Sequence, residues 1–293
     1  MRRYPFVTVD VFTSRALSGN GLAVFTDAAG LSDAEMQALA REMNLSETTF
    51  VLARDAAVER ERGVSVRIFT IGYELPFAGH PTLGTAYVLA RMRQRRDIVL
   101  DLKVGRIPIR FTDREGEMFG EMTQRDPEFG FVHNATEVAA VTGLPPGAID
   151  ASLPIQTVST GVAFAIVPII SLASFAELHV DQVRILPYLE RTATHQFYFV
   201  SRETRDPAAR LHARMQFIGG EDPATGSAAG DAAAWMVRNG IAHPGEQVLI
   251  EQGIEVQRPS RIFVRASLDG SRVHDVRVGG HVVEVIRGEV SLP

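Results

Sequence analysis

The sequence predicts an α+β protein built from two similar halves, and three observations lead to this prediction. A chain of 293 residues exceeds the usual size of one hydrophobic core, so two domains of roughly 100–150 residues are expected. Strand-like segments dominate both halves. One motif, [His/Asp]-Pro-x-x-Gly-[Thr/Ser]-Ala, occurs once in each half, beginning at His80 and at Asp222, which are 142 positions apart (222 minus 80).

The predicted strands are short runs of alternating or β-branched residues. In the first half they cover 6–12, 22–26, 48–53, 64–70 and 107–112. In the second half they cover 155–161, 163–170, 195–201, 213–218, 247–253, 261–268, 273–280 and 281–288. Strand is therefore the expected main element of both halves.

The predicted helices are fewer. The segment 32–45 begins with Ser32 as an N-cap and Glu35 three residues later, which is a capping box. The two copies of the motif lead into helical runs over 87–96 and 229–240, and 136–147 is a short fourth helix. Each half is thus expected to curl its strands around one long helix. Pro, Gly and polar residues at 123–134 interrupt the pattern and indicate the domain boundary.

The composition is that of an ordinary globular protein, with 45% hydrophobic and 22% charged residues. A net charge of −5 and a pI near 5.9 give no basic surface for nucleic acid, and the arginines of 91–96 are expected to complement a helix C-terminus. No run approaches the ~18 apolar residues of a membrane span, and no signal peptide is recognisable, so a cytoplasmic protein is expected. The chain has no cysteine, which excludes disulfides, thiolate metal sites and thiol nucleophiles.

The repeated motif is expected to begin a helix in each half. Proline is favoured at the first helical position, which would make His80 and Asp222 N-caps. The small residues that follow would leave the N–H groups of the first turn open to an anion such as a carboxylate. If an approximate twofold axis relates the halves, the two helix starts face each other across a cleft.

A plain capping role is the alternative for each copy of the motif, because Asp-Pro commonly enters a helix as a cap. Histidine is a mediocre cap, yet His80 stands where the other copy has Asp222. Both side chains can move protons, and this unlike pair favours a functional reading.

Three separated segments resemble the PhzF family of phenazine-biosynthesis isomerases: NLSETTFV (44–51), ELPFAGHPTLGTA (74–86) and GGEDPATGSAAG (219–230). The resemblance extends from the N-terminal VDVFTSRALSGNGLAVF to the last strands. It implies the diaminopimelate epimerase-like fold, in which two similar lobes each wrap a barrel-like sheet around a central helix, with the active site in the cleft between them. The expected lobes are 1–128 and 129–293, either with these bounds or with the last C-terminal strand completing the first lobe.

The resemblance also implies site residues. Glu47 matches the glutamate of the family's isomerases, and the alternative reading of this residue is an exposed acid at a helix-to-strand junction. His80, Asp222 and Ser227 complete the implied proton-transfer group. The N–H groups of Gly79, Gly226 and Ser227 would hold the substrate carboxylate. Asn20 matches the family's Gly-Asn-Pro, although Gly21 replaces the proline here.

The predicted function is a cofactor-independent isomerase that moves a proton between carbons of a small unsaturated carboxylic acid, similar to trans-2,3-dihydro-3-hydroxyanthranilate isomerase. No metal, nucleotide or flavin motif is present. Alternatives are a racemase or epimerase that uses His80 and Asp222 as two bases, and a non-catalytic protein that binds small anions. A metal hydrolase built from Glu47, His80 and Asp222 has too few ligands at metal-binding spacing. The resemblance further suggests a homodimer, and no nucleic-acid or membrane partner is expected.

Overall fold

A computed structural model describes residues 1–293, apart from the side chain of Pro146. The chain forms two compact units, the first made of residues 1–123 and 279–293 and the second of residues 124–278. Relative to the lobes expected from the sequence, residues 124–128 lie in the second unit and the last fifteen residues lie in the first. The long C-terminal strand β17 (Arg272–Leu292) contributes residues to both units.

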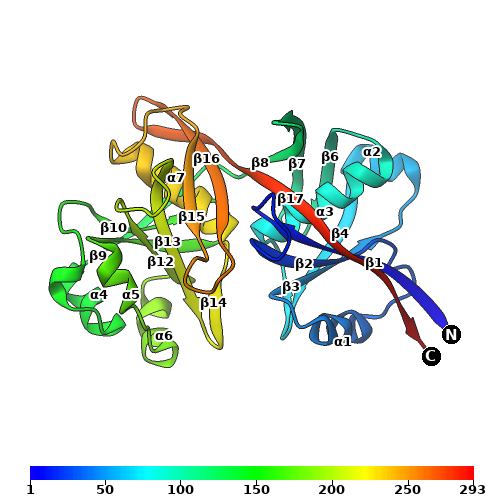
Figure 1. The fold of residues 1–293 in the computed structure, drawn as a ribbon, viewed down its shortest axis with the longest axis horizontal. Coiled ribbons are helices and arrows are strands. Elements are labelled where there is room, and N and C mark those ends of the chain that lie inside the picture. The colour runs from blue at the N-terminus through cyan, green and yellow to red at the C-terminus, as the bar shows by residue number, and fades with distance from the viewer. The chain divides into compact units, whose positions relative to one another are not determined.

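The first unit is a mixed sheet around one buried helix (Figure 1). Its strands are β1 (Arg2–Val11), β2 (Asn20–Phe25), β3 (Glu47–Leu52), β4 (Val64–Thr70), β5 (Glu74–Leu75), β6 (Asp97–Leu102), β7 (Gly105–Arg114) and β8 (Glu117–Thr123). β2 pairs with β3, and β4 with β6, in parallel. The antiparallel pairs are β1 with β2 and with β17, β3 with β4, β4 with β5, β6 with β7 and β7 with β8. Helix α3 (Gly79–Arg93) contacts β1, β2, β3, β6, β7 and β8, so it is the central helix of this unit.

The second unit repeats this plan with different lengths (Figure 1). Its strands are β9 (Glu128–His133), β10 (Ile155–Ser159), β11 (Ala163–Ile169), β12 (Gln196–Ser201), β13 (Ala209–Phe217), β14 (Gly220–Asp222), β15 (Val248–Gln252) and β16 (Ser260–Asp269). β11 pairs with β12, and β13 with β15, in parallel, as the corresponding strands of the first unit do. Helix α7 (Gly226–Arg238) packs on β10, β11 and β16, and every residue from Gly226 to Val237 is buried.

The outer helices are shorter. The first unit carries α1 (Asp33–Met43) and α2 (Ala56–Arg62), and the second carries α4 (Ala135–Thr142), the 3-10 turn η1 (Pro146–Ala148), α5 (Leu172–Ala176) and α6 (Gln182–Arg191). The predicted capping box is confirmed, because Ser32 accepts from the Glu35 N–H while the Glu35 carboxylate accepts from the Ser32 N–H. None of the helices in the described part of the chain is long and apolar enough to cross a membrane.

Each unit contains a hairpin that leads into its own central helix. In the first unit β4 and β5 pair Ile68 with Leu75, and in the second β13 and β14 pair Met215 with Asp222. A bidentate Arg–Glu pair joins each hairpin, at Arg67–Glu74 and at Arg214–Glu221.

The structural repeat has a spacing of 147 positions (214 minus 67, 221 minus 74 and 226 minus 79). The spacing of 142 inferred from the motif is therefore wrong for the fold. In the structural register His80 corresponds to Ser227, and each is the second residue of its central helix. Asp222 corresponds to Leu75 and ends the hairpin strand instead of capping a helix.

Close packing of α3 on the sheet depends on Gly84. A Cβ atom at this position would lie 2.7 Å from a methyl carbon of Leu22 and 2.8 Å from one of Val11. Any larger side chain would therefore push the helix away from β1 and β2. This contact fixes the height of the α3 N-terminal turn above the strands that carry the neighbouring polar residues.

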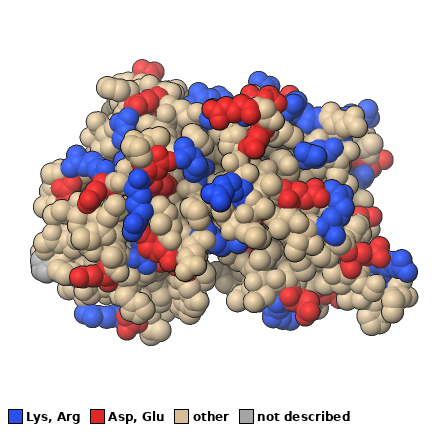
Figure 2. All heavy atoms as spheres, in the orientation of Figure 1, with Lys and Arg blue, Asp and Glu red and all other residues tan. Residues whose placement is uncertain are grey.

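Charged side chains of both signs are interspersed on the face shown in Figure 2. This distribution agrees with a net charge of −5 on a chain in which 22% of residues are charged.

Candidate functional site

Two of the predicted catalytic residues meet in the first unit. Glu47 is the first residue of β3, and His80 is the second residue of α3. Nε2 of His80 lies 3.3 Å from Oε2 of Glu47, and their side chains are 5% and 15% exposed. The alternative of a fully exposed surface acid at Glu47 is therefore wrong. The structure places a carboxyl group and an imidazole side by side in a largely dry environment.

Asn20, at the start of β2, fixes the orientation of the His80 ring. Its amide nitrogen lies 3.1 Å from Nδ1 of His80, and both residues are buried. In the tautomer that carries the ring proton on Nε2, the nitrogen that faces Glu47, the Asn20 amide donates to Nδ1. Nε2 makes no hydrogen bond within the described part of the chain. In the tautomer with the proton on Nε2, this N–H is available to a ligand.

The imidazole of His80 is neutral at pH 7. Burial lowers the pKa of His80 to about 3, and a hydrogen bond with the backbone of Gly21 opposes the shift only in part. The short contact with Glu47 is therefore between a carboxyl group and a neutral ring, and it is not an ion pair. A neutral N–H can donate a hydrogen bond to a developing oxyanion without competing with Glu47 for the proton.

The starts of the two central helices offer backbone donors. α3 begins at Gly79 after Ala78, and α7 begins at Gly226 after Thr225; neither of these preceding residues provides a side-chain cap. The expectation that His80 and Asp222 are N-caps is therefore wrong. The N–H groups of Gly79, Gly226 and Ser227 all belong to first turns, where helices leave N–H groups without an intrahelical partner.

Asp222 is held rigidly in the second unit. It is 8% exposed, and one carboxylate oxygen accepts from Oγ1 of Thr225 at 2.7 Å. The amide nitrogen of Gln252 donates to the backbone oxygen of Asp222 at 2.7 Å and to Oγ1 of Thr225 at 2.9 Å. The helix begins three residues after Pro223 because a residue before proline is driven to extended backbone, which extends β14 to Asp222.

The predicted site residues thus form one group in each unit. Asn20, Glu47, Gly79 and His80 belong to the first unit, and Asp222, Gly226 and Ser227 belong to the second. Thr225 and Gln252 were not expected to support Asp222. A hydroxyl three residues after an aspartate was the only sequence signal for Thr225, and a buried glutamine inside a strand gives no such signal.

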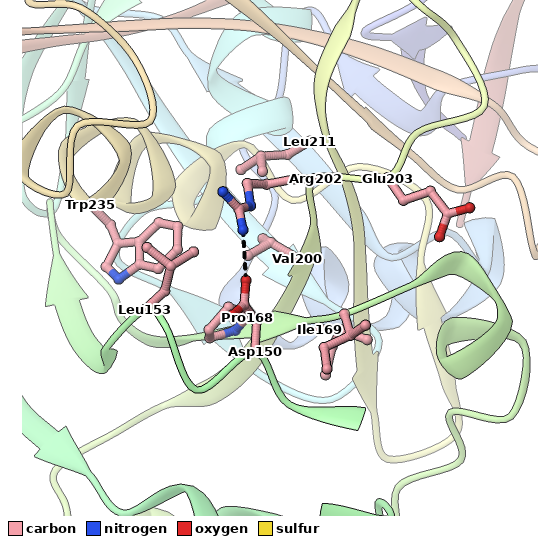
Figure 3. A pocket seen from close by; sticks show the side chains of 10 residues that line it. Asp150, Leu153, Pro168, Ile169, Val200, Arg202, Glu203, Leu211 and Trp235 are labelled. Carbon is pink, nitrogen blue, oxygen red and sulfur yellow. Dashed lines mark hydrogen bonds and ion pairs between the residues drawn. The ribbon is translucent and has the colours of Figure 1, made fainter. Parts of the chain in front are cut away.

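A pocket of about 340 Å³ lies in the second unit at the carboxyl ends of the parallel strands β11 and β12 (Figure 3). Two of its three charged side chains, Asp150 and Arg202, point at each other and form an ion pair at 3.0 Å, and Glu203 is the third. Leu153, Val200 and Trp235 contribute apolar walls. None of the predicted site residues lines this pocket, so it is separate from the chemistry described above.

Comparisons with known proteins agree with the fold and with the class of reaction. A family model described as phenazine biosynthesis-like protein (PhzC-PhzF) matches residues 9–288. The chain is 36% identical to trans-2,3-dihydro-3-hydroxyanthranilate isomerase of Pseudomonas aeruginosa, over 100% of both chains. A PhzF-family crystal structure from Bacillus anthracis has a TM-score of 0.88 and 29% identity, again over 100% of both chains.

A more distant likeness concerns the fold alone. A probable proline racemase from Agrobacterium radiobacter shows a TM-score of 0.67 at 11% identity, over 99% of this chain and 93% of that one. These neighbours confirm the predicted α+β fold of the diaminopimelate epimerase-like class.

Proposed function

Because the chain belongs to the PhzC-PhzF family and is an isomerase, we propose that it moves a proton between two carbons of a small unsaturated carboxylic acid. The substrate class is that of trans-2,3-dihydro-3-hydroxyanthranilate, on which the named relative from Pseudomonas aeruginosa acts. The contact between Glu47 and His80 is the observation that carries this proposal. It brings a proton acceptor within 3.3 Å of a neutral N–H donor.

Glu47 is the proposed proton carrier. Its carboxylate removes a proton from one carbon, the electron pair of that C–H bond moves into the adjacent π system, and a double bond shifts along the chain of carbons. The same carboxyl group then returns the proton to the carbon at the other end, so the reaction needs no oxidant or reductant. A positioned acid or base of this kind typically contributes about 10²–10⁴-fold to a rate.

His80 is proposed to donate from Nε2 to the oxygen on which negative charge develops. The proposed tautomer has Asn20 donating to Nδ1 and the proton on Nε2, and burial keeps the ring neutral. A fixed donor in a dry site stabilises an oxyanion more than water does, because it needs no reorganisation during the reaction. Proton donation from an imidazolium is not part of this proposal, since the charged form is scarce at pH 7.

The roles of Asp222, Gly79, Gly226 and Ser227 also remain proposals. They rest on the family resemblance and on the uncapped starts of α3 and α7. Ser227 gains support because it occupies the position in α7 that His80 occupies in α3. For the same reason the two-base racemase reading loses the pairing of His80 with Asp222 that suggested it.

Incubation in D₂O with trans-2,3-dihydro-3-hydroxyanthranilate and related unsaturated acids tests the proposal by NMR. We expect a shifted double bond, with deuterium at the receiving carbon to the extent that the proton on Glu47 exchanges with D₂O before it is returned. Incorporation at a single centre without a shifted double bond would indicate a racemase or epimerase, and neither incorporation nor a shifted double bond with any acid would indicate an anion-binding protein.

Two further predictions from the sequence are kept as proposals. A homodimer is expected, and light scattering that returns a particle of 32.0 kDa would contradict it. A cytoplasmic location is the other, and fractionation of cells that express the protein would test it.

A further inference from the structure

A buried side-chain network underlies the start of α7. The amide nitrogen of Gln124 donates to the backbone oxygen of Gly226 at 3.0 Å, and its Oε1 accepts from Oγ1 of Thr160 at 2.7 Å. Oγ1 of Thr160 also lies 2.8 Å from Oδ1 of Asp231, which accepts the Thr160 N–H at 2.7 Å. Gln124, Thr160 and Asp231 are 6%, 2% and 0% exposed, and all belong to the second unit.

The helix makes room for this network at Gly230. A Cβ atom there would lie 1.8 Å from Oε1 of Gln124 and 2.7 Å from its amide carbon. Only glycine therefore allows the Gln124 amide to lie along the first turns of α7 and reach Gly226. The contact between the Gln124 amide and Gly226 therefore lies within the buried first turns of α7, and no surface side chain takes part in it.

The number of protons available determines the direction of the hydrogen bonds from Asp231 through Thr160 to Gln124. Two oxygen-to-oxygen contacts, Asp231 to Thr160 and Thr160 to Gln124, each require a proton. The Thr160 hydroxyl supplies one, and the amide oxygen of Gln124 supplies none. With the Thr160 hydroxyl directed to Gln124, a proton on Asp231 supplies the second contact. Burial raises the pKa of Asp231 well above its ordinary value despite the opposing hydrogen bonds from Thr160 and from the backbone of Phe164, in agreement with this arrangement.

In this arrangement each side-chain donor of the hydrogen-bond chain points toward the oxygen of Gly226, while the Thr160 N–H donates to Asp231. That oxygen and the N–H of Ser227 belong to one peptide group, whose electrons are delocalised. A hydrogen bond donated to the oxygen draws electron density from the nitrogen and strengthens its N–H as a donor, and successive bonds polarise one another by about 10–30% each.

We infer that Asp231, as a neutral acid, acts through Thr160 and Gln124 to strengthen the Ser227 N–H as a donor to the substrate carboxylate. These three are positioning residues, because none of them touches the substrate. The inference rests on the proposed function for the identity of the anion. The buried network adds to the donor strength that the Ser227 N–H already has from the uncapped first turn of α7.

The matched variants Thr160→Val and Thr160→Ser test the hydrogen bonds that run through Thr160. Valine keeps the shape of threonine and removes the hydroxyl, whereas serine keeps the hydroxyl. The probe is 3-hydroxyanthranilate, an aromatic carboxylate related to the proposed substrate, with binding measured by calorimetry. We expect Thr160→Val to raise its Kd by about 3- to 30-fold, and Thr160→Ser to bind as the wild-type protein does.

A second probe separates donor strength from general disruption. 2-Aminophenol lacks the carboxylate of 3-hydroxyanthranilate, so its affinity should be the same in the wild-type protein and in Thr160→Val. Equal weakening of both probes, or unchanged binding of 3-hydroxyanthranilate by Thr160→Val, would overturn the inference.

Infrared spectroscopy tests the proton on Asp231 without any ligand. The wild-type protein at pH 7 should show the carbonyl band of a protonated carboxyl group, and this band should be absent in Asp231→Asn. Absence of the band in the wild-type protein would overturn the inference. A wild-type protein that shows the band yet neither binds nor converts carboxylates would instead refute the proposed function.

Discussion

Replacing Asn20 by aspartate should invert the tautomer of His80. The amide nitrogen that donates to Nδ1 at 3.1 Å becomes an oxygen that accepts, so the ring proton moves to Nδ1 and Nε2 loses the N–H that faces Glu47. In a serine-protease triad, exchanging the group that sets the histidine tautomer lowers kcat by about 10⁴. We expect a loss of about 10²–10⁴ in kcat here, because one positioned donor is removed.

The assay combines steady-state kinetics with ¹⁵N NMR of the histidine rings, which reports the protonated nitrogen directly. Asn20→Ala is the uncharged companion variant. It removes the donor without adding a carboxylate, and it should lose about 1–3 kcal/mol of stability because the buried Nδ1 is left without its hydrogen bond. Circular dichroism checks that both variants fold. An Asn20→Asp protein that folds and keeps both the wild-type rate and the Nε2-protonated ring would refute the reasoning.

Three further predictions concern stability. Burial lowers the pKa of His80 from 6.5 to about 3, so the unfolded chain binds one more proton between these values; the stability conferred by the neutral ring is full above pH 6.5 and is lost as the pH falls toward 3. In urea unfolding at decreasing pH, the free energy of unfolding of His80→Gln should fall less steeply than that of the wild-type protein, by up to about 1.4 kcal/mol per pH unit. Parallel curves for the two proteins would contradict this. Gly84→Ala should cost about 1–3 kcal/mol in thermal unfolding because its Cβ overlaps aliphatic side chains of β1 and β2, whereas Gly147→Ala, which meets open space, should be nearly neutral; equal melting temperatures for the two would count against the packing argument. Arg214→Met should cost about 3–5 kcal/mol in denaturant unfolding, since it leaves the buried carboxylate of Glu221 without its bidentate partner, and a wild-type midpoint would show that the pair contributes nothing.

Local signals in the sequence predicted most of the secondary structure. The alternation of 64–70 and 107–112 corresponds to β4 and β7, and the capping box at Ser32 gives the start of α1 to within one residue. These features depend on neighbouring residues, which is why a single sequence is enough to find them. The amphipathic helix α6 was missed, because Pro187 lies inside it and proline normally ends a helical pattern.

The register of the internal repeat could not be obtained by aligning the identical residues of the two motif copies. The motif aligns Gly84 with Gly226, but the structure aligns Gly79 with Gly226, because in the first unit the helix begins before His80-Pro81. Proline is tolerated anywhere in a first turn, where its missing N–H costs nothing, so Pro81 does not locate the helix start. The pairing of β-hairpin residues, which decides the register, depends on contacts between segments.

The polar contacts of the candidate site were the least predictable part. Glu47 and His80 were chosen together from the family resemblance, but the donation from Asn20 to Nδ1 of His80 depends on how β2 and α3 pack. The neutral Asp231 is a stronger example. Its sequence context, GSAAGDAAA, gives no indication of a buried acid that is hydrogen-bonded to a loop residue about seventy positions earlier, at Thr160.

The central claim is that Glu47 carries the proton, and Glu47→Gln tests it most directly. The glutamine keeps the size and the hydrogen-bonding reach of the side chain but cannot take up a proton under these conditions. Glu42→Gln, a change at an exposed glutamate of α1, is the matched control. The measurement is the rate of the double-bond shift in trans-2,3-dihydro-3-hydroxyanthranilate, or in another acid that the wild-type protein converts, followed by NMR. We predict that Glu47→Gln binds 3-hydroxyanthranilate as the wild-type protein does while this rate falls by at least about 10²–10⁴-fold, and that Glu42→Gln behaves as wild type; a wild-type rate in Glu47→Gln would contradict the account.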